Sequence, residues 1–194
     1  MLIVSYYTPD YAEHADRLRK SCAWETHWIE PVEDTGSWVN NCARKAAFVL
    51  RALRSQNEDV LWLDADAEIR KPIHKWFDFD EDLDFAVYRD EGQANPKWKF
   101  RSGTVWFNQT PAAHTLCEHW ARKCEEDPRR FDQESLWLAW VQQDEPRTHW
   151  LPMSYCQRIG EPGYKDADAH ILHYQASRTL KRKNSFGAPT VGNP

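Results

Sequence analysis

The sequence predicts an α/β fold, and stretches in its N-terminal third carry that prediction. Residues 2–7 form a β-prone run that ends at Thr8-Pro9-Asp10, and residues 11–22 then place apolar or small side chains at helical spacing. Residues 38–55 have the pattern of an amphipathic helix, and residues 60–63 are an apolar run of strand length. Strands alternating with helices in this way are typical of α/β proteins.

The remaining elements continue this alternation. We expect helices over residues 112–124 and 133–141, and a polar, basic and aromatic loop over residues 93–100 that covers a cleft. A short helix is expected near Trp76 and Phe77. Strands are expected over residues 27–30, 83–88, 101–108, 149–155 and around 170–174.

Length and composition favour one soluble domain. A chain of 194 residues with 41% hydrophobic residues can bury one core, which we place over residues 1–180, followed by a basic tail at 181–194. No apolar run is long enough to span a membrane, and the N-terminus has no leader pattern, so we expect a cytoplasmic protein.

Cysteine usage and charge exclude several classes of site. Five cysteines without a Cys-x-x-Cys pair argue against a zinc cage and against a disulfide framework. The net charge of −5 gives no overall attraction to nucleic acid, so a nucleic-acid partner would need a local basic patch.

Two carboxylates follow the apolar run at residues 60–63. Asp64 and Asp66 are two positions apart, so in an extended chain they project from the same side and could share one hard cation. Ligands of open α/β sheets bind at the carboxyl ends of the strands, where this pair is expected. The alternative is a loop that happens to be acidic.

Four motifs in order resemble the nucleotide-sugar glycosyltransferases of the GT-A type, most closely the small members related to glycosyltransferase family 8. They are Asp64-Ala65-Asp66, Ser102-Gly103 before an apolar run, Asp132-Gln133 at a helix start, and His173 followed by Arg178. The resemblance implies the GT-A fold, with a mixed central sheet flanked by helices and a Rossmann-like N-terminal half. One departure is Gln175-Ala176-Ser177, where the family usually has a glycine shortly after the last histidine.

The resemblance also implies roles for particular residues. Asp64, Asp66 and His173 would hold Mn²⁺ or Mg²⁺ against the diphosphate of a UDP-sugar. The donor would also contact Tyr6, Tyr7, Thr8, Lys45, Ser102, Gly103, Arg178 and Lys181, and the catalytic candidates are Asp132, Gln133 and Asp90. Family 8 enzymes retain the anomeric configuration; Asp132 or Asp90 would be the base if the reaction inverts.

Several of these residues have a plain structural alternative. Tyr6 and Tyr7 fit an aromatic strand end packed under a helix, and Lys45 fits a solvated basic helix face. Asp132 fits a helix N-cap, and the basic tail fits a frayed terminus.

The sequence thus predicts a metal-dependent glycosyltransferase that moves a sugar from a UDP donor to a hydroxyl. The acceptor is left open among a modified base in DNA, a protein and a glycan. The alternatives are a metal-dependent nucleotidyl or phosphate-ester enzyme, because paired aspartates also serve phosphoryl chemistry, and a non-catalytic module that binds sugar or nucleic acid.

Overall fold

A six-stranded mixed sheet forms the centre of the protein. The computed structural model describes residues 1–23, 25–73, 77, 79, 82–144, 146–178 and 180. In spatial order the strands are β2 (His27–Pro31), β1 (Leu2–Tyr7), β3 (Val60–Leu63), β6 (Phe100–Phe107), β5 (Phe85–Arg89) and β7 (Thr148–Trp150). β2, β1 and β3 are parallel neighbours, whereas β6 runs antiparallel to both β3 and β5. The predicted mixed sheet with a Rossmann-like N-terminal half is confirmed.

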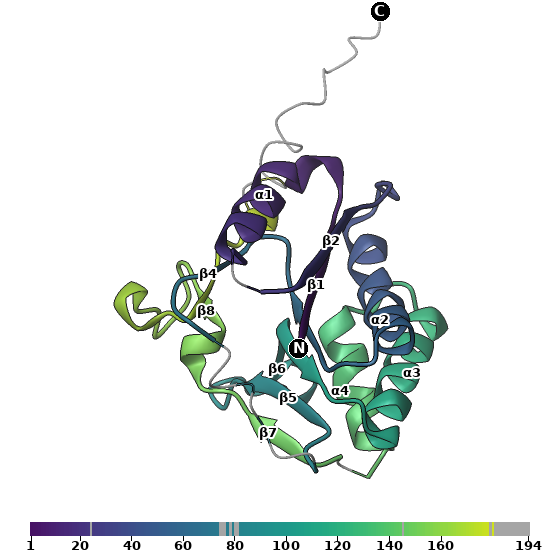
Figure 1. Cartoon of the computed structure of the whole chain (residues 1–194). Helices are drawn as coiled ribbons and strands as arrows, with labels where there is room; N and C mark the ends of the chain where they lie inside the picture. The colour runs from purple at the N-terminus through teal and green to yellow at the C-terminus, as the bar shows by residue number, and fades with distance from the viewer. Residues whose placement is uncertain are drawn as a thin grey trace, which may run out of the picture.

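A smaller sheet joins the middle of the chain to its C-terminal part. It consists of β4 (Ala67–Ile69), β9 (Ile171–His173) and β8 (Gln157–Arg158), with β9 in the centre. β4 runs antiparallel to β9 and places Ala67 opposite His173, while β8 is parallel to β9 and places Arg158 opposite His173. Figure 1 shows β4 and β8 on the side of the molecule away from α2 and α3.

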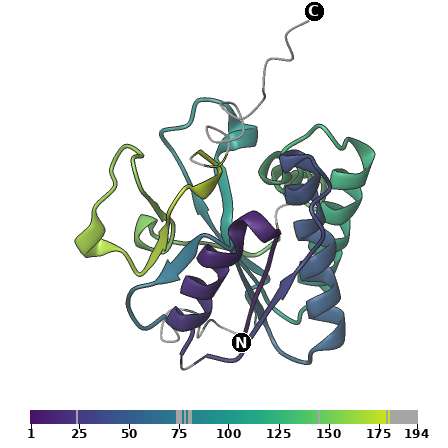
Figure 2. The same ribbon diagram turned by 90° about the horizontal axis from the view of Figure 1, so that it is seen from above.

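The helices cover the central sheet unequally. α2 (Trp38–Ser55), α3 (Pro111–Glu126) and α4 (Asp132–Gln142) pack side by side, and α1 (Ala12–Ser21) lies beside β4. Figure 2 shows α1 between the small sheet and the group of three helices. Within the part of the chain that the structure describes, every helix is too short or too polar to span a lipid bilayer.

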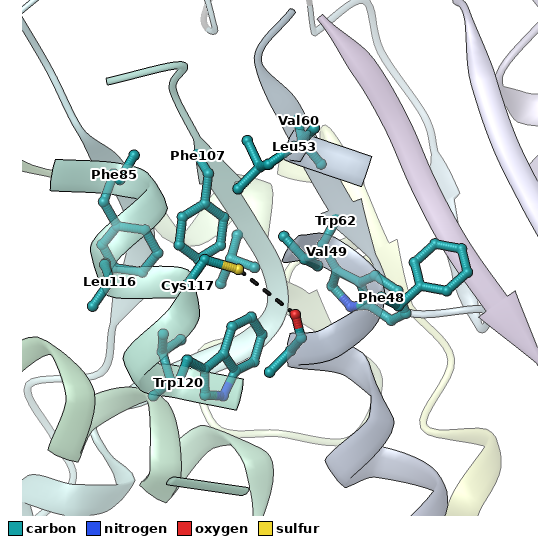
Figure 3. Packing of buried hydrophobic residues seen from close by; sticks show 14 of the residues in the cluster. Phe48, Val49, Leu53, Val60, Trp62, Phe85, Phe107, Leu116, Cys117 and Trp120 are labelled. Atoms are coloured by element: carbon teal, nitrogen blue, oxygen red, sulfur yellow. Dashed lines mark hydrogen bonds between the residues drawn. The ribbon is translucent and has the colours of Figure 1, made fainter. Parts of the chain in front are cut away.

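Strand alternation divides the core into two clusters. Val60 and Trp62 of β3 face the cluster under α2, α3 and α4, whereas Leu61 and Leu63 face the cluster on the other side of the sheet. Figure 3 shows the first cluster, in which Phe107 and Trp120 stack with ring centroids 6.0 Å apart. None of the five cysteines forms a disulfide in this structure.

Element boundaries differ from the predictions mainly at prolines and turns. The strand expected over residues 149–155 ends at Trp150, because Pro152 cannot donate to a ladder and instead precedes a 3₁₀ turn, Met153–Tyr155. The expected loop contains a 3₁₀ turn, Pro96–Trp98, and β6 begins at Phe100, so Ser102 and Gly103 lie inside a strand. The short helix expected near Trp76 falls mostly outside the described residues.

Candidate active site

A cleft of about 260 Å³ opens at the edge of the sheet where the parallel strands β1 and β3 end. β1 ends at Tyr7 and β3 ends immediately before Asp64, so the side chains that follow both strands gather at the same edge. The predicted site residues that line the cleft are Tyr6, Tyr7, Thr8, Lys45, Asp64, Asp66, Ser102, Gly103, Asp132, Gln133 and His173.

The two aspartates and the histidine lie together in this cleft. Asp64, Asp66 and His173 each offer one ligand atom, and the three atoms lie within 4.8 Å of one another. The small sheet causes this approach, because the chain passes from Asp66 directly into β4, and β4 pairs with the strand that carries His173. The backbone N–H of Tyr174 also donates to the Asp66 carbonyl at 3.0 Å.

Each aspartate is fixed by one oxygen and presents the other. Asp64 Oδ1 accepts from the Trp62 indole Nε1 at 2.8 Å, and its Oδ2 faces Gly103 and His173. Asp66 Oδ2 accepts from the Ala176 backbone N–H at 2.8 Å, and its Oδ1 lies 3.9 Å from His173 Nδ1. Burial alone would raise the pKa of Asp66, but His173 and the Ala176 amide outweigh it and hold the pKa below its ordinary value.

The imidazole of His173 is buried and oriented by a hydroxyl. Its Nε2 lies 2.9 Å from Thr104 Oγ1, which leaves Nδ1 directed at the aspartates. Gly103 provides the space for this arrangement: a Cβ there would lie 2.9 Å from His173 Cε1 and 3.1 Å from Asp64 Oδ2. A side chain at position 103 would therefore displace the ring or the carboxylate.

The spacing and chemistry of these three groups fit one divalent cation. Six-coordinate ligands at about 2.1 Å lie about 3 Å apart when adjacent and about 4.2 Å apart when opposite. The observed limit of 4.8 Å is slightly wider, so side-chain shifts well below 1 Å would close the set around an ion. Carboxylate oxygens and an imidazole nitrogen are ligands of Mn²⁺ and related metals.

Lys45 lies beside this group at the floor of the cleft. Its Nζ is 2.8 Å from Asp64 Oδ1 and 2.7 Å from Asp132 Oδ2, and it donates to the Ser102 carbonyl at 3.2 Å. The expectation of a solvated basic helix face is wrong for Lys45, which is 4% exposed because its turn of α2 faces the end of the sheet. Burial alone would lower the pKa of Lys45, but the Asp132 and Asp64 carboxylates hold it well above its ordinary value.

Asp132 is the first residue of α4, but it does not cap the helix. Phe131 occupies the N-cap position, so the expectation of an N-cap role for Asp132 is wrong. The Asp132 side chain instead pairs with Lys45 and accepts from the Ser102 hydroxyl at 2.6 Å. Its carbonyl accepts from the Trp120 indole at 2.9 Å, which anchors the start of α4 to α3.

A bulge in β6 brings Ser102 and Gly103 to the cleft. Val105 pairs with Val87 of β5, whereas the next pair along is Arg101 with Tyr88, so three residues of β6 have no counterpart in β5. The Gly103 carbonyl instead accepts from the Asp64 backbone N–H at 2.9 Å. At the bulge, β6 is therefore hydrogen-bonded to the backbone of Asp64.

The end of β1 forms another part of the cleft wall. Tyr6 packs against the rings of Phe48 and Trp62, with centroids 5.4 and 5.1 Å away, and its hydroxyl donates to the Asn41 carbonyl. Burial raises the pKa of Tyr6 well above its ordinary value, so the phenol remains a donor. The expected aromatic packing of Tyr6 is therefore present, although the residue also borders the cleft.

Three predicted residues are not brought to this cleft. Asp90 is not part of the lining; its carboxylate accepts from Arg101 and from the Gly92 backbone N–H. Burial alone would raise the pKa of Asp90, but Arg101 holds it below its ordinary value. Arg178 is also outside the lining and pairs with Glu161, and Lys181 lies outside the described residues.

Sequence reasoning missed several residues of the cleft, among them Arg101, Arg158, Trp38 and Gln175. Arg101 could have been found from its place next to Ser102-Gly103, but Arg158 lies on a two-residue strand with no periodic signal. Gln175 has φ = 57°, in the left-handed region that favours glycine. The missing glycine of the motif is thus replaced by a residue in a conformation that glycine adopts more easily.

Comparisons with known proteins agree with this geometry. The profile of the nucleotide-diphospho-sugar transferase family matches residues 30–185. No curated protein matches the chain. A solved glycosyltransferase involved in the glycosylation of the major capsid of PBCV-1 has a TM-score of 0.74 at 15% identity, with 95% of this chain and 97% of that chain covered.

Two further structures show the same fold. The glycosyltransferase GlyE of Streptococcus pneumoniae TIGR4 has a TM-score of 0.66 at 14% identity, over 89% of this chain and 54% of that chain. The galactosyltransferase LgtC, solved with donor and acceptor sugar analogs, has a TM-score of 0.56 at 14% identity, over 98% of both chains. These structures confirm the predicted GT-A fold. Because the family profile covers most of its length, the chain belongs to the nucleotide-diphospho-sugar transferase family.

Proposed function

We propose that this protein is a metal-dependent glycosyltransferase that moves a sugar from a UDP donor to a hydroxyl group. The observation that carries the proposal is the convergence of Asp64, Asp66 and His173 in the one cleft that also contains Lys45 and Asp132. Family membership supports a nucleotide-sugar donor.

The metal would be held by Asp64, Asp66 and His173. We assign the ligand atoms Asp66 Oδ1 and His173 Nδ1, which are 3.9 Å apart, and Asp64 Oδ2, which lies as near as Nδ1 to a Cβ built at Gly103. The imidazole ligand favours Mn²⁺ over Mg²⁺, since magnesium prefers an all-oxygen shell. A bound cation stabilises the charge that develops on a diphosphate leaving group. Thr104 would favour the tautomer with Nδ1 unprotonated, because its hydroxyl oxygen can accept a hydrogen bond from Nε2–H.

Lys45 has a positioning role in this proposal. It holds Asp64 and Asp132 in place through contacts of 2.8 and 2.7 Å, and its charge lies next to the expected position of the diphosphate. Because the ammonium is buried, its field is weakly screened there. Gly103 contributes by leaving space for His173 and Asp64.

Two other walls of the cleft would bind the nucleoside of the donor and, at the opposite end, the sugar with the acceptor hydroxyl. Tyr6, Tyr7 and Thr8 border it at the end of β1, where we place the nucleoside. Asp132 and Gln133 border it at the start of α4, where we place the sugar and the acceptor hydroxyl. Asp90 and Arg178 are assigned no catalytic or donor-binding role in this proposal, because each is held in an ion pair outside the lining.

The decisive experiment is a screen of UDP-sugars for Mn²⁺-dependent hydrolysis, with free sugar and UDP as the expected products. Asp66→Asn should abolish turnover and weaken Mn²⁺ binding in calorimetry while the circular dichroism spectrum is unchanged. Asp168→Asn, an exposed aspartate in the 3₁₀ turn Asp166–Asp168, is the matched control.

Other outcomes of the same screen would favour the alternatives. Cleavage of the diphosphate bond, which releases UMP and a sugar 1-phosphate, would support a nucleotidyl or phosphate-ester enzyme, and undiminished turnover by Asp66→Asn would refute the assignment. Ligand binding that is unchanged after metal removal, without any turnover, would support a non-catalytic binding module.

The acceptor classes are a modified base in DNA, a protein and a glycan. The sequence feature behind the DNA acceptor is the basic run Lys181-Arg182-Lys183, which lies outside the described residues. Contacts of such a run with phosphates predict binding to duplex DNA that weakens steeply as salt rises. Absence of binding at low salt would eliminate this acceptor.

A further inference from the structure

Two arginines line the cleft without a role in the proposed reaction. Arg101 comes from β6 and Arg158 from β8, and their side chains are only 13% and 18% exposed. Asp90 lies between them: its Oδ2 accepts from Arg101 Nη2 and lies 3.9 Å from Arg158 Nη2. We call Arg101 and Arg158 the arginine pair.

The two carboxylates beside the arginine pair neutralise it only in part. Within the described residues, these carboxylates are Asp90, which both arginines share, and Glu161. Glu161 lies 3.5 Å from Arg158 and is also paired with Arg178, whose side chain is 55% exposed. Arg158 thus has no carboxylate of its own in a largely buried wall, and a buried charge is costly unless a partner or water reaches it.

Hydrogen-bond donors of the pair also remain available. Arg101 Nε is buried and makes no hydrogen bond to any part of the chain that the structure describes. Arg158 approaches its carboxylates only at 3.5 and 3.9 Å, longer than a strong charge-assisted bond. A guanidinium has five N–H donors in a planar fork that matches carboxylate and phosphate oxygens.

The strand order places the arginine pair across the metal group from the proposed nucleoside site. In the central sheet β3, which leads to Asp64, lies between β1 and β6. In the small sheet β9, which carries His173, lies between β4 and β8. A donor with its nucleoside at the end of β1 and its diphosphate at Asp64 would therefore extend its sugar toward Arg101 and Arg158. This step depends on the proposed function.

We propose that the arginine pair recognises an anionic group, a carboxylate or a phosphate, on the sugar side of the diphosphate. The group comes either from the transferred sugar, as in a UDP-uronic acid, or from the acceptor next to its reactive hydroxyl. In both cases the anion accepts hydrogen bonds from guanidinium donors that the carboxylates of the protein leave available, such as Arg101 Nε. Asp90 is then a positioning residue that holds both arginines at the wall.

The test compares charged and neutral substrates in two arms. In the first arm, kcat/KM for Mn²⁺-dependent release of UDP is measured with UDP-glucuronate and UDP-galacturonate against UDP-glucose and UDP-galactose. In the second arm, transfer from the best neutral donor is measured to glucose 6-phosphate against methyl glucoside. Each arm uses the wild type, Arg158→Gln, Arg158→Lys, Arg101→Gln and the control Arg129→Gln, whose side chain is 93% exposed.

We expect the wild type to prefer the charged compound in one arm, which identifies the source of the anion. Arg158→Gln should reduce that preference about 10- to 100-fold, the factor for loss of one charge-assisted hydrogen bond, while turnover of neutral compounds changes little. Arg158→Lys should recover part of the preference, and Arg101→Gln should reproduce the loss if Arg158→Gln folds poorly.

Two results would overturn the inference. The first is a wild type with no preference for charged compounds in either arm, and the second is an equal loss for charged and neutral compounds in Arg158→Gln. If neutral UDP-sugars turn over normally in these cases, the proposed function stands while the arginine assignment fails. If no donor turns over, the proposed function fails. Calorimetric titration of the same compounds then tests the arginine assignment, and equal affinities for charged and neutral compounds would overturn it.

Discussion

Replacing Lys45 with methionine should destabilise the protein by about 3 kcal/mol at pH 7. Removal of one partner from a buried ion pair costs about 3–5 kcal/mol, because the remaining charge stays buried. The full cost applies only to the ion pair with Asp132, whose side chain is 8% exposed. The side chain of Asp64 is 37% exposed, so solvent screens its charge and its ion pair contributes less. Methionine retains most of the apolar packing of the lysine stem.

The effect should depend on pH in a direction that the Lys45 environment fixes. In the wild type, the raised pKa of Lys45 gives stabilisation that is present at neutral pH and is lost as the pH rises through the folded-state value, above the ordinary 10.5. In Lys45→Met, the buried Asp132 carboxylate becomes the unfavourable charge. Because the variant lacks the Lys45 stabilisation at every pH, the difference in stability between wild type and variant should shrink as the pH rises above 10.5.

Urea unfolding followed by tryptophan fluorescence at pH 7 and above pH 10.5 measures both effects. Lys20→Met, at an exposed position of α1, should change the free energy of unfolding by no more than about 0.5 kcal/mol. Asp132→Asn added to Lys45→Met should restore part of the loss. A loss below about 1 kcal/mol that neither pH nor Asp132→Asn alters would refute our account of the buried ion pairs.

Two further predictions concern the metal group, and a third concerns the backbone at Gln175. Thr104→Val should weaken Mn²⁺ binding about 10- to 100-fold in calorimetry, because it removes the hydrogen bond that orients His173. Thr104→Ser keeps the hydroxyl and should bind Mn²⁺ as the wild type does. Gly103→Ala should weaken Mn²⁺ binding at least about tenfold, because its Cβ would displace His173 or the aspartate, and unchanged affinity would contradict the space argument. Gln175→Gly should raise the free energy of unfolding, measured in urea, by about 0.5–1 kcal/mol, since glycine adopts the left-handed conformation at this position without steric strain. A decrease would show that contacts of the glutamine side chain outweigh the strain of its backbone.

Local pattern in the sequence was sufficient for much of the fold. The bounds predicted for α2 and β3 agree with the structure, because a long amphipathic stretch and a short apolar run leave few alternatives. The late strand was overextended to residue 155, since Pro152 was not weighted as a strand terminator.

The candidate site was harder to predict, for a reason that Lys45 illustrates. A periodic helix pattern assigns every lysine to solvent, and the compensating carboxylates come from Asp64 and Asp132, far away along the chain. The approach of His173 to the aspartates was likewise predicted only through the resemblance to a family, because pairing between β4 and β9 has no local signature. Neither the local sequence pattern nor the family resemblance predicted Arg158.

The pairing of β4 with β9 also determines when the cleft can form during synthesis. Asp66 and Ala176, which hydrogen-bond to each other, are 110 positions apart, so a ribosome completes nearly the whole described chain before the partner strand emerges. Contacts between such distant segments form late, since the closure of a long loop must precede them. A nascent chain therefore carries two aspartates without their histidine, and the cleft to which we assign a cation and a donor is complete only after β9 has docked.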